Sequence, residues 1–174
     1  MAAEKGVVTV FGANYSNHSL AMAPILQKAR IPMISPYSTH PDVTRIGDYI
    51  FRACYTDTFQ GEIVAAFALK ALGADTAGVL INANRKYSEG LAKSFAERYT
   101  QMGGIILFTG NYLDETADFK YLIKQIESAR PRMVFLPGYI KDSAFIIKQA
   151  NQSGVVSTFI GGDGWRNIMY QVVG

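Results

Sequence analysis

Residues 77–102, AGVLINANRKYSEGLAKSFAERYTQM, hold one complete strand-plus-helix unit in a single stretch. The apolar run Ala77–Ile81 shows no alternation with polar residues, which is typical of a strand buried on both faces. The residues that follow carry Leu91, Phe95 and Tyr99 at helical spacing. The stretch therefore predicts a parallel-sheet strand followed by a helix that covers it.

The same pattern recurs along the chain, with most strand starts about 25 to 28 residues apart, the length of one strand plus one helix. Alternating strands and helices, with near-continuous apolar strands, predict an α/β fold built from doubly wound parallel sheets. The expected strands are Val7–Phe11, Pro32–Ser35, Tyr49–Ala53, Ala77–Ile81, Ile105–Phe108, Met133–Leu136 and Thr158–Ile160, and the expected helices are Asn17–Ala29, Thr58–Leu72, Ser88–Met102, Thr116–Ala129 and Asp142–Gln152.

Two of these helices carry further local signals. Ile63, Phe67 and Ala71 form an apolar stripe on the second helix, and we expect this stripe to face the core. Pro24 lies inside the first helix and predicts a kink or a delayed start there.

One interval breaks the rhythm and indicates a change of unit. Between Ser35 and Tyr49 there is no clear helical pattern, and the polar segment Tyr55–Asp57 follows the next strand. We therefore place a boundary near residues 54–57. Residues 1–54 are predicted to form part of a first lobe, and residues 55–174 most of a second.

The composition excludes several classes of protein. The chain has 174 residues, of which 49% are hydrophobic and 18% charged, as expected for a soluble globular protein. A net charge of +3, with basic and acidic residues mixed, gives no reason to expect a nucleic-acid partner. The lone Cys54 cannot form an internal disulfide, and no clustered His/Cys pattern indicates a metal. No apolar run is long enough for a membrane helix, and the first residues lack the pattern of a signal peptide.

Enzyme motifs are also missing from the sequence. There is no G-x-G-x-x-G after the first strand, no phosphate-binding G-x-x-x-x-G-K-[ST] and no G-x-S-x-G, so we expect neither a cofactor nor an enzyme. Ser35, His40 and Asp42 supply the residue types of a catalytic triad, but their close spacing argues against triad geometry.

The strand ends carry the groups that indicate a binding site. The segment Ile31–Pro41, IPMISPYSTHP, is a short apolar strand that opens into hydroxyl side chains. Ligands of open parallel sheets bind beyond the carboxyl ends of the strands. The candidate ligand-binding residues at these ends are Ser16, Tyr37, Thr39, Tyr87, Tyr139 and Asp163.

Together these groups suit a small zwitterion. A helix N-terminus beside the Ser16 hydroxyl favours a carboxylate, and Thr39 could add a donor. Asp163 would suit an ammonium group, supplemented by the faces of Tyr87 and Tyr139.

Each candidate also has a purely structural interpretation. Ser16 could simply cap its helix, with Ser19 as the alternative cap. Thr39 could bond nearby backbone, Asp163 could be a turn residue between glycines, and the tyrosines could have packing or surface roles.

The sequence resembles the type I periplasmic substrate-binding proteins of ABC importers, specifically the leucine/isoleucine/valine-binding branch. The likeness runs over nearly the whole chain, although members of the family are about twice as long, so the chain resembles a fragment. It is carried by Ile31–Pro36 with Thr39 and Pro41, Phe51-Arg52 with Asp57 and Gln60-Gly61, Tyr87–Leu91, Asp118-Phe119, Gly138-Tyr139 and Gly162–Trp165.

The resemblance implies two α/β lobes that close on a ligand in the cleft between them. By position, Ser16 and Thr39 match groups that hold the ligand carboxylate, with help from the backbone at Tyr37. Tyr87 and Tyr139 match tyrosines of the facing lobe. Asp163 matches the acid that meets the ammonium group, where the branch has a longer Glu, and Tyr37 replaces a usually small residue.

The function implied is a solute-binding component of an ABC importer, located in the periplasm or at the cell surface, that binds an amino acid or a related amide. Its partners would be the ligand and the importer's membrane subunits, and the part missing from a family-length protein favours self-association. The alternative is a ligand-sensing domain of a receptor or regulator with the same fold. An upstream signal peptide or lipoprotein cysteine would favour the transporter, and an attached transmembrane or DNA-binding segment the sensor.

Overall fold

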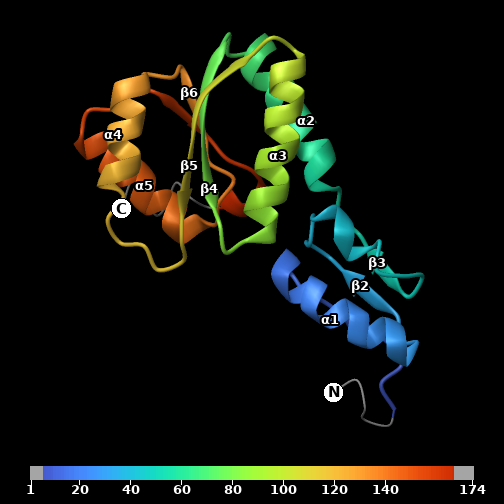
Figure 1. Ribbon diagram of the computed structural model, residues 1–174. Helices are drawn as coiled ribbons and strands as arrows, with labels where there is room; N and C mark the ends of the chain where they lie inside the picture. The colour runs from blue at the N-terminus through green and yellow to red at the C-terminus, as the bar shows by residue number, and fades with distance from the viewer. Residues whose placement is uncertain (1–5, 167–174) are drawn as a thin grey trace.

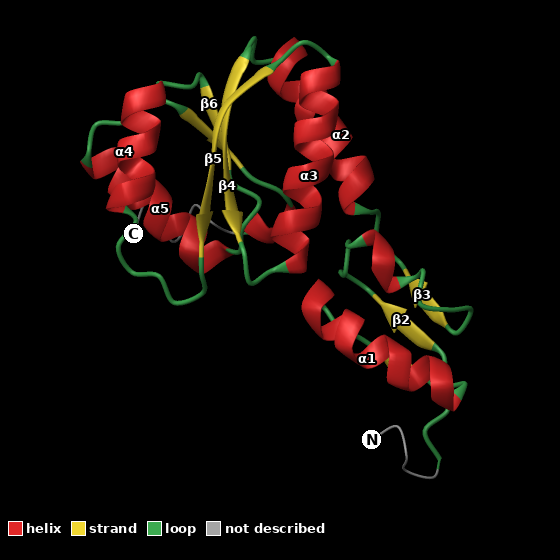
Figure 2. Ribbon diagram, viewed as in Figure 1, coloured by secondary structure: helices red, strands yellow, loops and turns green. Residues whose placement is uncertain are grey.

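The computed structural model describes residues 6–166 and contains two parallel sheets, each with its own helices (Figures 1 and 2). The predicted α/β fold of doubly wound parallel sheets is confirmed. The strands are β1 (Val10–Phe11), β2 (Met33–Ser35), β3 (Ile50–Arg52), β4 (Thr76–Asn82), β5 (Ile105–Tyr112), β6 (Met133–Phe135) and β7 (Thr158–Ile160), and the helices are α1 (Ser16–Ala29), α2 (Asp57–Lys70), α3 (Lys86–Gln101), α4 (Lys120–Ala129) and α5 (Ile140–Gln152), with short 3-10 turns η1 (Pro41–Val43) and η2 (Asp163–Trp165).

The larger sheet has the strand order β5-β4-β6-β7 and is covered on both faces (Figure 2). Successive strand residues point to opposite faces, so Val79 and its neighbour Leu80 belong to different cores. Val79 packs with Phe95 and other residues of the α2 and α3 side, whereas Leu80 packs with Leu122 and others of the α4 and α5 side. Two separate cores therefore hold this sheet between its helices.

Helix α2 packs on α3 through small residues rather than large ones. The expectation that Ile63, Phe67 and Ala71 face the core is wrong, because all three are exposed. The buried face instead includes Gly61 and Ala65. A Cβ on Gly61 would lie only 2.6 Å from a backbone nitrogen of α3, so the two helices approach backbone to backbone at this position.

The smaller sheet has the order β1-β2-β3 and is covered on one face by α1. Leu26 of α1 packs with Met33 and Ile50 of the sheet. The helix begins at Ser16, well before Pro24, so of the two expected effects of this proline, a kink or a delayed start, the delayed start is wrong.

The other face of this sheet carries a row of exposed apolar side chains. Phe11 pairs in register with Ile34, and Ile34 pairs with Phe51. Their exposed fractions are 76%, 39% and 49%. These three residues, which we call the apolar row, leave a contiguous hydrophobic strip in contact with solvent.

The two sheets are joined by residues 53–56, and the Asn17 side chain also bridges them. Cys54 lies in this connection, half-buried, and burial raises the pKa of its thiol. The amide of Asn17 at the start of α1 donates to the Asn84 carbonyl at 2.8 Å and accepts from the Lys86 N–H at 2.8 Å. The division into residues 1–54 and 55–174 stays a prediction. In residues 6–166, no helix has both the length and the apolar character needed to cross a membrane.

Candidate functional site

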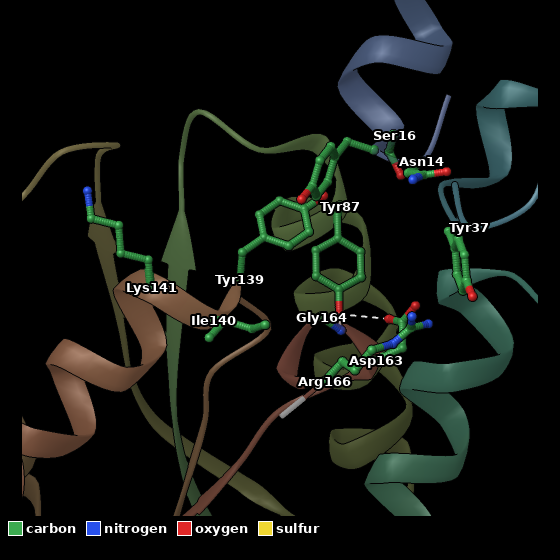
Figure 3. Close-up of a pocket in the computed structure, with 11 residues that line it drawn as sticks. Asn14, Ser16, Tyr37, Tyr87, Tyr139, Ile140, Lys141, Asp163, Gly164 and Arg166 are labelled. Atoms are coloured by element: carbon green, nitrogen blue, oxygen red, sulfur yellow. Dashed lines mark hydrogen bonds between the residues drawn. The ribbon is translucent and has the colours of Figure 1, made fainter. Parts of the chain in front are cut away.

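A cavity of about 430 Å³ lies where α1 meets the strand ends of the larger sheet (Figure 3). Five of the six predicted ligand-binding residues line it, and Thr39 does not. The described residues that line the cavity are Asn14, Tyr15, Ser16, Tyr37, Tyr87, Tyr139, Ile140, Lys141, Asp163, Gly164 and Arg166. The structure therefore brings together residues that lie far apart in the sequence, from Asn14 to Arg166.

Tyr87 and Asp163 form a hydrogen-bonded pair in the lining of this cavity (Figure 3). The Tyr87 hydroxyl donates to Asp163 Oδ1 at 2.9 Å and accepts from the Gly164 N–H at 3.0 Å. Burial, followed by the negative charge of Asp163, raises the pKa of Tyr87 well above its ordinary value. The tyrosine therefore remains a donor at neutral pH and holds the carboxylate in a fixed orientation.

Three tyrosines form an aromatic wall. The rings of Tyr87 and Tyr139 are stacked, with centroids 5.1 Å apart and planes 18° apart. Tyr15 meets Tyr139 edge-on at 4.9 Å. Burial raises the pKa of Tyr139, so its hydroxyl also stays protonated. Stacked ring faces beside a carboxylate suit an organic cation such as an ammonium group.

Ser16 does not cap its helix, contrary to one interpretation of the sequence. Tyr15 occupies the N-cap position and makes no side-chain capping bond, whereas Ser16 is the first helical residue. The buried Ser16 hydroxyl instead accepts the His40 N–H at 3.3 Å. Ser19, the alternative cap, bonds the Ser38 hydroxyl at 2.7 Å. The start of α1, with its outward N–H groups and positive dipole end, still faces the cavity.

Thr39 lies buried beside Asp57, outside the cavity lining. Within residues 6–166, the Thr39 hydroxyl and both Asp57 carboxyl oxygens have no hydrogen-bond partner. Burial raises the pKa of Asp57 to about 7. The nearby Thr39 hydroxyl opposes part of this rise in pKa, although its geometry falls short of a hydrogen bond. The role of Thr39 as a carboxylate donor stays a prediction.

Two cations of the lining were not among the residues predicted from the sequence. Lys141 comes from the first turn of α5, and Arg166 follows η2 directly. The Arg166 guanidinium lies 4.7 Å from the centroid of the Tyr37 ring. In the part of the chain that the structure describes, no group of three or more His, Cys, Asp or Glu side chains is placed to hold a metal ion.

Comparison with known proteins gives consistent relatives. Residues 1–170 match the family model described as periplasmic binding protein. The leucine-specific-binding protein of Salmonella typhimurium is 28% identical over 163 residues, which are 93% of this chain and 44% of that protein. The Leu/Ile/Val-binding protein homolog 3 of Brucella melitensis is 26% identical over 170 residues, 97% of this chain and 46% of that protein. The chain thus spans about half the length of the curated relatives it matches.

Solved structures agree with the fold. A leucine-binding protein from Thermotoga maritima superposes with a TM-score of 0.93 at 32% identity, covering 98% of this chain and 49% of that one. A branched-chain amino acid transporter substrate-binding protein from Streptococcus pneumoniae, in complex with isoleucine, gives a TM-score of 0.89 at 27% identity, with 98% and 49% covered. Both sheets and their helices therefore have counterparts in about half of a solved protein.

Proposed function

The chain belongs to the periplasmic binding protein family, and from this premise we propose that its cavity binds an amino acid or a related small amide. The protein would act as the solute-binding component of an ABC importer, in the periplasm or at the cell surface, and would deliver its ligand to the importer's membrane subunits. It would bind its ligand without transforming it.

One observation carries this proposal: the same cavity holds one group that attracts an anion and another that attracts a cation. The start of α1 at Ser16 offers N–H groups and a positive dipole end to an anion. Asp163 offers a negative charge in an orientation that Tyr87 holds. A zwitterion is the small molecule that satisfies both ends at once.

The aromatic wall supports the same ligand class. Tyr87 lies next to Asp163, and Tyr139 is stacked on the far side of Tyr87 (Figure 3). An ammonium group at Asp163 would gain a charge-assisted hydrogen bond and lie near the Tyr87 ring, where cation–π attraction can add to it. The tyrosine rings of the lining also provide apolar surface for the carbon skeleton of the ligand.

Isothermal titration against a panel of amino acids and their amides tests the proposal, using the protein in the full length that its gene encodes. We expect at least one member of the panel to bind, and Asp163→Asn to weaken that binding by roughly tenfold or more, since the ion pair between Asp163 and the ligand ammonium group would be enclosed once the ligand is bound. Asp118→Asn, the same change at an exposed carboxylate, is the matched control and should leave affinity unchanged.

Two results would contradict the proposal. If no amino acid or amide binds, the ligand class is wrong. If one binds with equal affinity to wild type and Asp163→Asn, the assignment of Asp163 is wrong.

A further inference from the structure

The lining of the cavity differs from what a branched aliphatic side chain needs. Ile140 is the one aliphatic side chain among the described residues that line it. The other described side chains end in hydroxyl, amide or charged groups, and the glycine has none. An aliphatic ligand side chain gains affinity by leaving water for apolar surroundings, and here these are mainly tyrosine rings rather than aliphatic groups.

The charges of the described lining residues do not balance. Lys141 and Arg166 are cationic, and Asp163 is the one acid among them. The start of α1 adds a further partial positive charge. Lys141 also lines a neighbouring pocket together with Asp114, Glu115 and Asp142, so its charge is met there. A neutral zwitterion would engage Asp163 with its ammonium group and leave the charge of Arg166 unmatched among the described lining residues.

Tyr37 lies across from Tyr87, and the Arg166 side chain extends past Asp163 toward the Tyr37 ring (Figure 3). The guanidinium lies 4.7 Å from the Tyr37 ring centroid, a cation–π distance that restrains an otherwise exposed side chain. A guanidinium restrained in this way presents its planar fork to a carboxylate, which it can bind through two parallel hydrogen bonds.

We infer that Tyr37 and Arg166 select a ligand with a side-chain carboxylate, so that the preferred ligand is an acidic amino acid rather than a branched-chain one. This inference rests on the proposed function. The α-carboxylate faces the start of α1, the ammonium group faces Asp163, and the side-chain carboxylate faces Arg166. Tyr37 is a positioning residue that acts through Arg166.

Isothermal titration with L-glutamate, L-aspartate, L-glutamine and L-leucine tests the inference, again with the full-length protein. We expect the better acidic amino acid to bind at least about tenfold more tightly than leucine, and this preference to shrink as NaCl is raised, because added ions screen the charges. Arg166→Met should weaken binding of the acidic ligand roughly tenfold and change leucine affinity by less than about twofold.

Matched variants separate charge from position. Arg98→Met makes the same change on an exposed residue in the last turn of α3 and should alter neither affinity. Tyr37→Phe keeps the ring and should keep the preference, whereas Tyr37→Ala should reduce it.

The failures are distinguishable. If leucine binds more tightly than either acidic amino acid, or if Arg166→Met weakens all ligands equally, the inference is overturned while the proposed function stands. If no amino acid binds at all, the proposed function fails and the inference fails with it.

Discussion

Replacing Asp57 by asparagine should remove a pH dependence that the wild-type fold carries. Asp57 is the first residue of α2, fully buried, and neither of its carboxyl oxygens has a hydrogen-bond partner within residues 6–166. The charged groups around it are Arg52, which favours its ionised form, and Asp163, which opposes it. The His40 ring lies close by, since a Cβ on Gly90 would touch both that ring and Asp57.

The size of this change in folding stability follows from the pKa of Asp57. Burial is the main cause that raises the pKa of Asp57 from 3.8 to about 7. The folded state therefore holds this proton more tightly than the unfolded chain does. The resulting stabilisation is complete below pH 3.8 and is lost as pH rises through 7, and it amounts to roughly 4 kcal/mol at about 1.36 kcal/mol per pH unit.

Urea denaturation at pH 4, 6 and 8 measures this effect as a difference between two proteins. Burial lowers the pKa of His40, which gives the opposite slope, but that slope is common to wild type and Asp57→Asn. The free energy of unfolding of the variant relative to wild type should therefore rise by several kcal/mol between pH 4 and pH 8. Asp75→Asn, at an exposed carboxylate, is the control and should show no such trend. Parallel curves for wild type and Asp57→Asn would refute the reasoning.

Three further outcomes follow from the packing. Gly61→Ala should lower the free energy of unfolding by about 1–3 kcal/mol, because its Cβ would meet α3 backbone at 2.6 Å; a gain of about 1 kcal/mol in urea denaturation, as helix propensity alone gives, would contradict the close approach. Thr39→Val should raise the free energy of unfolding by up to about 1 kcal/mol in urea denaturation, since the lost hydroxyl is buried and unpaired among the described residues; a loss of stability would contradict this. The same variant tests the predicted role of Thr39 as a carboxylate donor, which requires weaker ligand binding by titration. The 174-residue chain should form a dimer or larger species by light scattering, because the apolar row is exposed to solvent. Replacing both Ile34 and Phe51 of this row by serine should shift the chain toward monomer, and a monodisperse wild-type monomer would contradict the prediction.

The strands and most helices could be predicted because their signals are local. The run Ala77–Ile81 is apolar without interruption, and the structure places it within β4. The buried face of α2 could not be predicted in the same way, because this helix carries apolar residues on all of its sides. Its large members, Ile63 and Phe67, lie outside, and only the backbone approach at Gly61 decides which side is buried. That approach depends on α3, which no local pattern of α2 describes.

The candidate site could be predicted in part from the residues that follow the strands. Tyr87, Tyr139 and Asp163 each follow a strand, and the geometry of a parallel sheet brings such positions to one edge. Arg166 and Thr39 show the limit of this rule. The side chain of Arg166 returns to the cavity beyond a short turn, and Thr39 turns inward toward Asp57, and both directions are set by tertiary packing.

Cys54 gives the molecule a single chemical handle. It is the sole thiol of the 174 residues and lies in the connection between the two sheets, with Asp163 close enough to affect its pKa. Because burial raises the pKa of that thiol, a maleimide dye should react slowly at neutral pH and faster in mildly alkaline buffer. A fluorophore attached there would sit beside the cavity without any engineered cysteine, so ligand capture could be followed optically in real time.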